Sequence, residues 1–316
     1  MELPTGYFVR HPGSRDSEAI AQVVVAEDIA DFGEPDFTED DLLDDWKRPR
    51  FNLGDDAWVL IGPTGRIVGY AYVWEALPGE DIEADAFLLP EYQGRGLGNH
   101  LIGVIEDRAA EVAAGREMRL GIFTSRVNDG KRDLLERRGF QPVRAALRLK
   151  IDLEHRPPKA ADPPEGVEVR AYTPADEQAV RSMMLDVYSG HGRYTNRRFE
   201  EWLELRLEHP AFDPTLWRVA LCGDLIVGVV LVYDVGQTGY MSSLAVRPGW
   251  RRRGVGPALL RDAFETLRDR GQMRVLVSID ADVAPEMTQV YADAGMRVHE
   301  QHDWFEKTVE LATDQE

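Results

Sequence analysis

The sequence predicts an α/β protein built from two tandem domains of one kind, each with a mixed central β-sheet flanked by helices. Three observations lead to this fold class. The chain of 316 residues repeats a set of landmarks at about half its length, and each half alternates short apolar strands with amphipathic helices. Between the halves lies HRPPKAADPPEG, residues 155–166, which has the proline-rich, polar composition of a linker. The expected domains are therefore 1–154 and 167–316.

The repeat consists of residue pairs with similar neighbours and nearly the same offset. They are Gly96 with Gly254, Gly69 with Gly228, Gly139 with Gly295, and Arg10 with Arg170, which lie 158, 159, 156 and 160 positions apart. Four landmarks in the same order indicate two homologous halves.

The elements of each half follow one order: strand, two helical stretches, a hairpin, a strand, a helix, a strand, a short helix and a last strand. In the first half the expected segments include 7–10, 38–47, a hairpin with its turn at Gly62–Gly65, 83–88 and 118–124. In the second half they include 167–172, 195–208, a hairpin with its turn at Gly223–Asp224, 239–246 and 273–280. Apolar residues recur at helical spacing after 96 and after 254, which predicts a helix there in each half.

Composition limits the classes of function. The formal net charge of -19 argues against a nucleic-acid partner. It suits a cationic small-molecule substrate such as an amine, and the alternative is that the acidic residues only keep the protein soluble. The chain has a single cysteine, Cys222, which points to a reducing compartment. Neither a membrane-spanning apolar run nor a secretory signal is visible, so we expect a cytoplasmic protein with no membrane partner.

A charged, glycine-containing loop occurs once in each half. The second half reads VRPGWRRRGVGPALL at 246–260, and the first half reads LLPEYQGRGLGNHLI at 88–102. A loop of this kind between a strand and a helix is an anion site, because the first N–H groups of the helix have no internal partner and arginines add charge. The third glycine of a Rossmann fingerprint is missing from both loops, and no P-loop occurs in the chain.

The two loops resemble the acyl-CoA pyrophosphate loop of the GNAT N-acyltransferase superfamily, and the resemblance covers nearly the whole chain. It implies that acyl-CoA binds to Arg251, Arg252, Arg253, Gly254, Val255, Gly256 and Pro257, and in the first half to Gln93, Gly94, Arg95, Gly96, Leu97 and Gly98. The tandem layout, the size and the FDP of HPAFDPTLW are also similar, more weakly, to the mycothiol synthases.

The resemblance further implies direct transfer from acetyl-CoA, or another acyl-CoA, to an amine. The backbone before each loop is expected to bind the pantetheine arm through Leu244, Ala245 and Val246, and in the first half through Ala86, Phe87 and Leu88. Tyr291, four residues before Gly295, is expected to protonate the leaving thiolate. The first half has Leu135 at that position but retains Asn128 near the expected pantetheine site. We therefore expect the second domain to be catalytic and the first to be degenerate.

The sequence does not identify the general base. The strand 239–246 carries no carboxylate, and Tyr240 stands about where the mycothiol synthase resemblance places a glutamate. Asp234, Asp280, Asp282 and a water chain are the candidates in the second half, and Glu83 and Asp85 lie on the matching strand of the first half. No spacing indicates a metal site, and His191, His299 and His302 give no catalytic pattern.

Two functions remain possible from the sequence. The first is an acyl-CoA-dependent N-acetyltransferase acting on a small amine, with the mycothiol synthase reaction as one case. The second is a non-catalytic acyl-CoA-binding protein, which the missing base and the degenerate first half favour. Tyr291 and the intact RRRGVG loop favour the enzyme, which is the function that we expect. The two halves suggest a monomer that packs as a pseudo-dimer.

Overall fold

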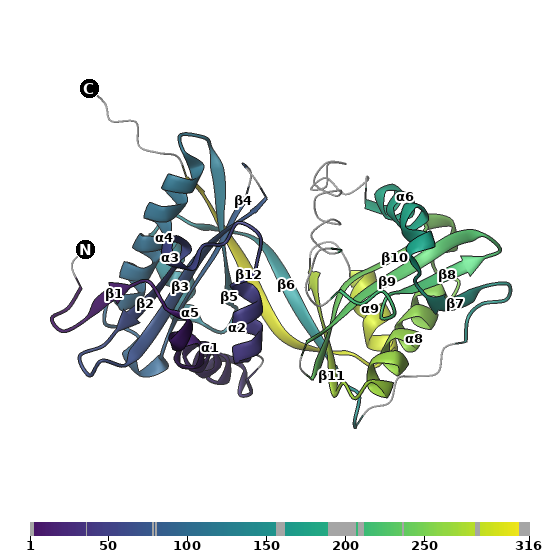
Figure 1. The fold of residues 1–316 in the computed structure, drawn as a ribbon, viewed down its shortest axis with the longest axis horizontal. Coiled ribbons are helices and arrows are strands. Elements are labelled where there is room, and N and C mark those ends of the chain that lie inside the picture. The colour runs from purple at the N-terminus through teal and green to yellow at the C-terminus, as the bar shows by residue number, and fades with distance from the viewer. Residues whose placement is uncertain are drawn as a thin grey trace. The chain divides into compact units, whose positions relative to one another are not determined.

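The computed structural model describes residues 3–35, 37–77, 79, 81–155, 162–188, 207, 212–235, 237–281 and 285–309. The chain divides into two compact units, Met1–Ala146 with Glu300–Glu316 and Leu147–His299. Each unit contains a mixed sheet with helices packed on it, which confirms the expected fold class (Figure 1).

The first unit has the strand order β1-β2-β3-β4-β5-β12. Its strands are β1 (Phe8–Arg10), β2 (Ala57–Ile61), β3 (Ile67–Leu77), β4 (Asp81–Leu88), β5 (Met118–Ser125) and β12 (Arg297–Val309). Neighbouring strands are antiparallel except β4 and β5, which are parallel. Its helices are α1 (Ser17–Phe32), α2 (Glu39–Asp45), α3 (Leu53–Asp56), α4 (Leu97–Ala113) and α5 (Asp129–Arg137).

The second unit repeats this plan in the order β6-β11-β10-β9-β8-β7. Its strands are β6 (Gln141–Asp152), β7 (Glu168–Ala171), β8 (Arg218–Cys222), β9 (Leu225–Val235), β10 (Thr238–Val246) and β11 (Arg274–Asp280). The parallel pair is β10 with β11. Its described helices are α6 (Glu177–Tyr188), α8 (Val255–Asp269) and α9 (Pro285–Asp293). The helical stretch expected at 195–208 lies outside the described residues, apart from residue 207.

The compact units differ from the division by sequence repeat in their last strands. From Glu300 onward β12 belongs to the first unit, although its residues end the second half of the sequence. From Leu147 onward β6 belongs to the second unit, where Leu149 and Ile151 are fully or almost fully buried in the core. Each unit is therefore completed by a strand from the other half of the chain.

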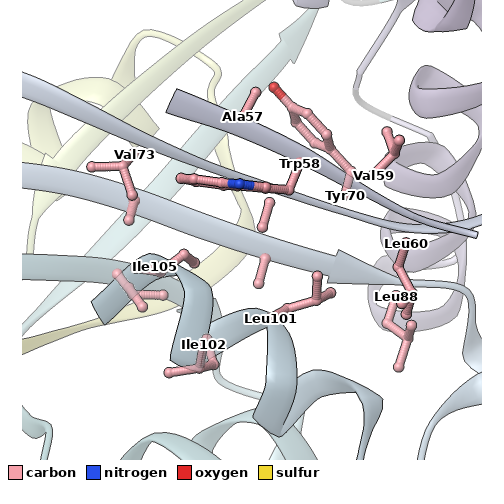
Figure 2. Close-up of a cluster of buried hydrophobic side chains, with 14 of the residues drawn as sticks. Ala57, Trp58, Val59, Leu60, Tyr70, Val73, Leu88, Leu101, Ile102 and Ile105 are labelled. Carbon is pink, nitrogen blue, oxygen red and sulfur yellow. The ribbon is translucent and has the colours of Figure 1, made fainter. Parts of the chain in front are cut away.

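The core of the first unit lies between its sheet and α4. Every residue of β2 is buried, because helices cover both faces of the sheet. Leu101, Ile102 and Ile105 lie on the side of α4 that faces the strands, as the sequence periodicity predicts (Figure 2). This packing holds the N-terminus of α4 beside the end of β4.

The repeated landmarks have physical reasons. Gly69 and Gly228 let a central strand approach the helix, since a Cβ on Gly228 would lie 2.9 Å from Leu259 Cδ1. Arg10 and Arg170 each bind an aspartate six residues later, Asp16 or Asp176. Each aspartate also accepts the N–H of the residue just before its short 3-10 helix, Gly13 or Thr173.

No helix in the described parts of the chain is long and apolar enough to cross a membrane.

Candidate active site

The two candidate loops have the same backbone shape. Gly96 and Gly254 are the residues before α4 and α8, and their φ angles are 78° and 91°. Two residues earlier, Gly94 has φ 72° and Arg252 has φ 58°. This left-handed conformation costs an L-residue such as Arg252 roughly 1–2 kcal/mol. The second loop therefore holds an arginine where the first uses glycine, and it keeps the same turn.

Both loops offer unused backbone donors. Neither α4 nor α8 has a side-chain hydrogen bond at its N-cap, so the first N–H groups of these helices face the loop without a cap. A Cβ added at Gly94, Gly96 or Gly254 would meet nothing within 4 Å, so a ligand can come close to the backbone there. This shape and polarity fit the pyrophosphate of an acyl-CoA.

The arginines of the second loop are exposed and are positioned by local contacts. Arg251 Nε donates to the carbonyl oxygen of Val246 at 3.1 Å, which ties it to the end of β10. The Arg253 guanidinium lies 5.3 Å from the centre of the Trp250 ring. The first loop has a matching pair, with Arg95 5.1 Å from the Tyr92 ring. These contacts hold positive charge at the mouth of each loop.

The strand before each loop separates from its parallel neighbour. β10 pairs with β11 only as far as Met241, and β4 pairs with β5 only as far as Ala84. Beyond these points both strands continue to pair with the hairpin strand on their other side, through Val246 and Leu88. Among the described residues, the backbone of 244–246 and of 86–88 therefore has one edge without a strand partner, which we call the open edge.

The two strands differ at the point of separation. The register of β10 shifts between Met241 and Ser243, so that Ser242 is an extra, bulged residue. In β4 the register is regular from Glu83 to Leu88. The Ser242 hydroxyl oxygen is buried and has no hydrogen-bond partner among the described residues. The bulge re-aims the backbone of the second unit just before its open edge.

Tyr291 lies on α9, in the core of the second unit, and is 2% exposed. Burial, with a smaller contribution from Tyr188, raises the pKa of its hydroxyl well above the ordinary value. The hydroxyl is thus protonated at neutral pH and able to donate. Tyr188 and Ser243 form a hydrogen bond of 2.6 Å between their hydroxyls. The role of Tyr291 as proton donor stays a prediction.

In the first unit a cavity of about 330 Å³ brings together most of the predicted ligand-binding residues. Its lining includes Ala86, Phe87, Leu88, Gln93, Gly94, Gly96, Gly98 and Asn128, together with Glu27, Lys131, Leu134 and Arg137. Asn128 also caps α5, since its Oδ1 accepts the N–H of Lys131 at 3.1 Å. Leu135, which stands in place of a tyrosine, is fully buried in the core.

Two charged residues that line this cavity, Glu27 and Lys131, belong to a cluster with Asp85. The Lys131 ammonium lies 2.7 Å from Asp85 Oδ1 and 3.2 Å from Glu27 Oε1. Burial disfavours the ammonium, but these carboxylates outweigh that effect and raise the pKa of Lys131. Burial raises the pKa of Asp85 to about 6, although Lys131 opposes the shift. We call Glu27, Asp85 and Lys131 the charged trio.

These features have known counterparts. The profile of the Acetyltransferase (GNAT) family matches residues 21–140 and 178–296. The chain belongs to this family. It is an enzyme, an acyl-CoA-dependent N-acetyltransferase with two GNAT domains in tandem.

Individual relatives agree with the tandem arrangement. The chain is 24% identical over 307 residues to a mycothiol acetyltransferase of Catenulispora acidiphila, covering 91% of this chain and 94% of the relative. A mycothiol acetyltransferase of Beutenbergia cavernae is 30% identical over 72% of this chain and 75% of its own length. A GCN5-related N-acetyltransferase from Sphaerobacter thermophilus has a TM-score of 0.83 and 30% identity, with 99% of both chains covered. A tandem GNAT protein from the clavulanic acid pathway has the same fold, with a TM-score of 0.66 at 16% identity.

The acids considered as a general base lie in different surroundings. Glu83 is 3.9 Å from the Arg48 guanidinium, and Asp85 is bound to Lys131, so both acids of the first unit are ion-paired. Asp234 and Asp280 are half-buried at the ends of β9 and β11. Asp282 and His191 lie outside the described residues. His302 is hydrogen-bonded to Glu300 at 2.8 Å, and the described residues contain no cluster suited to a metal ion.

The sequence reasoning missed two members of the charged trio, Glu27 and Lys131. Glu27 stands three and four residues after Val24 and Val23, which are buried residues of α1. An acid at an inward-facing helical position was therefore a signal that could have been found. Lys131 carried no such signal, because its partners lie 46 and 104 positions away along the chain.

Proposed function

We propose that the second unit transfers the acetyl group of acetyl-CoA to a primary amine of a small molecule, within a ternary complex. The observation that carries this proposal is the bulge at Ser242, which lies at the start of an open strand edge leading to the arginine loop. At the same place the first unit has a regular strand and the charged trio. The difference supports catalysis in the second unit and a degenerate first unit.

The reaction follows from these parts. The amine nitrogen attacks the thioester carbonyl carbon, so a C–N bond forms and the C–S bond breaks. A backbone N–H on the open edge of β10 stabilises the oxyanion, and Tyr291 gives its proton to the departing thiolate. The amine gives up its proton to water or to a nearby carboxylate, which acts as the base. Holding both substrates together supplies much of the rate.

The amine fits the charge of the chain. A net charge of -19 attracts a cationic acceptor by long-range electrostatics. We further propose that the protein acts as a monomer in the cytoplasm, in keeping with its single cysteine.

Mycothiol acetylation is the second candidate. It is favoured by relatives of that name, which this chain matches over up to 97% of their own length. Against it, Tyr240 occupies the strand position where the resemblance places a glutamate. Among the described residues of β10 there is no carboxylate to replace that acid.

The test is thiol release from acetyl-CoA with a pool of small amines that includes the acceptor of mycothiol acetyltransferases. Tyr291→Phe should lower kcat by roughly 100-fold, the usual contribution of a general acid. Tyr172→Phe is the matched control, because Tyr172 is also buried in the second unit and is 5% exposed. Unchanged turnover in Tyr291→Phe would remove the assigned role, and release without an amine would contradict direct transfer.

A further inference from the structure

The open edge of β4 is already occupied by carboxylates. The N–H of Leu89 bonds to Val68 on β3, and N–H groups alternate in direction along a strand. The N–H groups of Leu88 and Ala86 therefore point to the open edge. Glu27 Oε2 accepts the first at 3.0 Å, and Asp85 Oδ1 accepts the second at 2.7 Å.

These bonds belong to the charged trio, which is buried. The side chains of Glu27, Asp85 and Lys131 are 10%, 13% and 11% exposed. The Lys131 ammonium also lies 5.0 Å from the centre of the Phe87 ring, inside the cavity lining. Removing one partner of such a cluster leaves another charge buried without compensation, so a neutral ligand does not displace it easily.

An acyl-pantetheine arm needs what this edge lacks. Its amide and thioester carbonyls are hydrogen-bond acceptors and require N–H donors. Along this edge they would meet the carboxylate oxygens of Glu27 and Asp85, which hold the N–H groups of Leu88 and Ala86 and are acceptors as well. The loop glycines Gly94 and Gly96 also line the cavity and leave room for a ligand, so the trio, rather than the loop, determines what enters.

The second unit has no such charges at the matching positions. The repeat offsets of 160 and 156 in the flanking helices make Val187 the counterpart of Glu27 and Met287 the counterpart of Lys131. On the strands, Ser243 is the counterpart of Asp85. Ser243 pairs with Leu231 and Asp85 pairs with Tyr72, and these partners stand at equivalent points of the two hairpins. Within the described residues no side chain caps the N–H groups of Leu244 and Val246.

We infer that Glu27, Asp85 and Lys131 close the first unit to acyl-CoA, so that the chain binds a single acyl-CoA, in the second unit. The placement of the single acyl-CoA in the second unit rests on the proposed function. It assigns the trio a specificity role: the trio prevents a second, unproductive acyl-CoA from binding to a unit whose loop retains the anion site.

Calorimetric titration of the full chain with acetyl-CoA tests the stoichiometry. The wild type should bind one equivalent. Arg252→Asp should weaken that binding by roughly 100-fold, because it reverses charge in the loop, and aspartate tolerates the left-handed conformation. Arg268→Asp makes the same charge change at the far end of α8 and should keep the single site. Two equivalents in the wild type, or one retained by Arg252→Asp, would overturn the inference.

Replacing the trio with its counterparts from the second unit tests its role directly. In the Arg252→Asp background, Glu27→Val with Asp85→Ser and Lys131→Met should create one site for acetyl-CoA. Glu27→Ala alone frees the Leu88 N–H, keeps the Asp85–Lys131 pair and should give weaker binding, which covers the case of a misfolded triple variant. A folded variant of either kind without any gain in binding contradicts the inference. Turnover is scored separately: one bound equivalent without acetyl transfer contradicts the proposed function and leaves the inference standing.

Discussion

Asp85 shows how burial changes the chemistry of one side chain. It shares the Lys131 ammonium with Glu27, so the trio has two carboxylates for one cation. Burial disfavours the excess negative charge, and the pKa of Asp85 is raised to about 6. One proton taken up below that pH makes the cluster neutral. The residue that first resembles a general base is thus part of a structural charge cluster.

This shift predicts the pH dependence of stability for Asp85→Asn. An unfolded aspartate has a pKa of about 3.9. The native carboxyl keeps its proton up to about pH 6, so between these values the native state binds more protons and the free energy of unfolding falls as pH rises. Asparagine lacks this dependence, and a shift of about 2 units corresponds to about 3 kcal/mol.

Urea unfolding across this range gives the measurement. The variant should gain about 3 kcal/mol over the wild type between pH 4 and pH 7. Glu91→Gln, at an acid whose side chain is 56% exposed, is the control and should show no such trend. A difference between Asp85→Asn and wild type that is constant with pH would contradict the raised pKa.

At the scale of elements, β4 and β10 are equivalent strands of the two units that differ by one inserted residue. Both end in a loop of the same shape, and both leave their parallel partner before the loop. The extra residue in β10 bends the strand and increases its twist, which changes the direction of its open-edge N–H groups. In the proposed function, this difference separates the catalytic unit from the degenerate one.

Deleting Ser242 should restore a regular ladder, because Met241 and Ser243 already pair with consecutive residues of β9. We expect the fold to persist and kcat to fall by roughly 100-fold or more, as for the loss of an oxyanion donor. Thiol release and the thermal midpoint report the two effects. A deletion variant with full turnover would show that the bulge has no catalytic part.

Gly228 is a packing position in β9. An added methyl group would lie 3.0 Å from Val255 and 3.2 Å from the carbonyl oxygen of Ala245, so Gly228→Ala should lower the free energy of unfolding by about 1–3 kcal/mol. Gly249→Ala, where nothing lies within 4 Å, is the control. Equal denaturation midpoints for the two variants would show that α8 can shift away from the strand.

At the scale of the whole molecule, the two halves of the sequence exchange their final strands. β12 pairs with β5 from His302 to Val309, and Phe305 is fully buried in the core of the first unit. Trp304 covers Gly121 so closely that a Cβ there would lie 1.8 Å from its ring. The first unit therefore depends on residues synthesised last.

Truncation after His299 tests this dependence. Removing the β12 residues that pair with β5 should destabilise the first unit, so its amides should lose protection in hydrogen exchange. Truncation after Val309 keeps every described pair of that ladder and should leave the protection unchanged. An unaltered exchange pattern after truncation at His299 would show that the first unit folds without β12.

The periodicity of the sequence was sufficient for α4 and α8, because residues such as Leu101 and Phe264 recur with the helical period and are buried as expected. The strands before the loops were also predicted closely, at 83–88 and 239–246 against the observed β4 and β10. The bulge at Ser242 was not, because a serine pair in an apolar strand does not show which residue leaves the ladder.

By itself the sequence determined the tandem plan, the α/β class and the two glycine-containing loops between a strand and a helix. Each of these depends on local composition, or on spacing that repeats within one half of the chain. Only the tertiary structure decided which strand completes which unit and which amides of β4 are capped. Those outcomes join residues as far apart as Phe123 and Trp304, or Glu27 and Lys131, and such pairings arise from packing rather than from any local pattern.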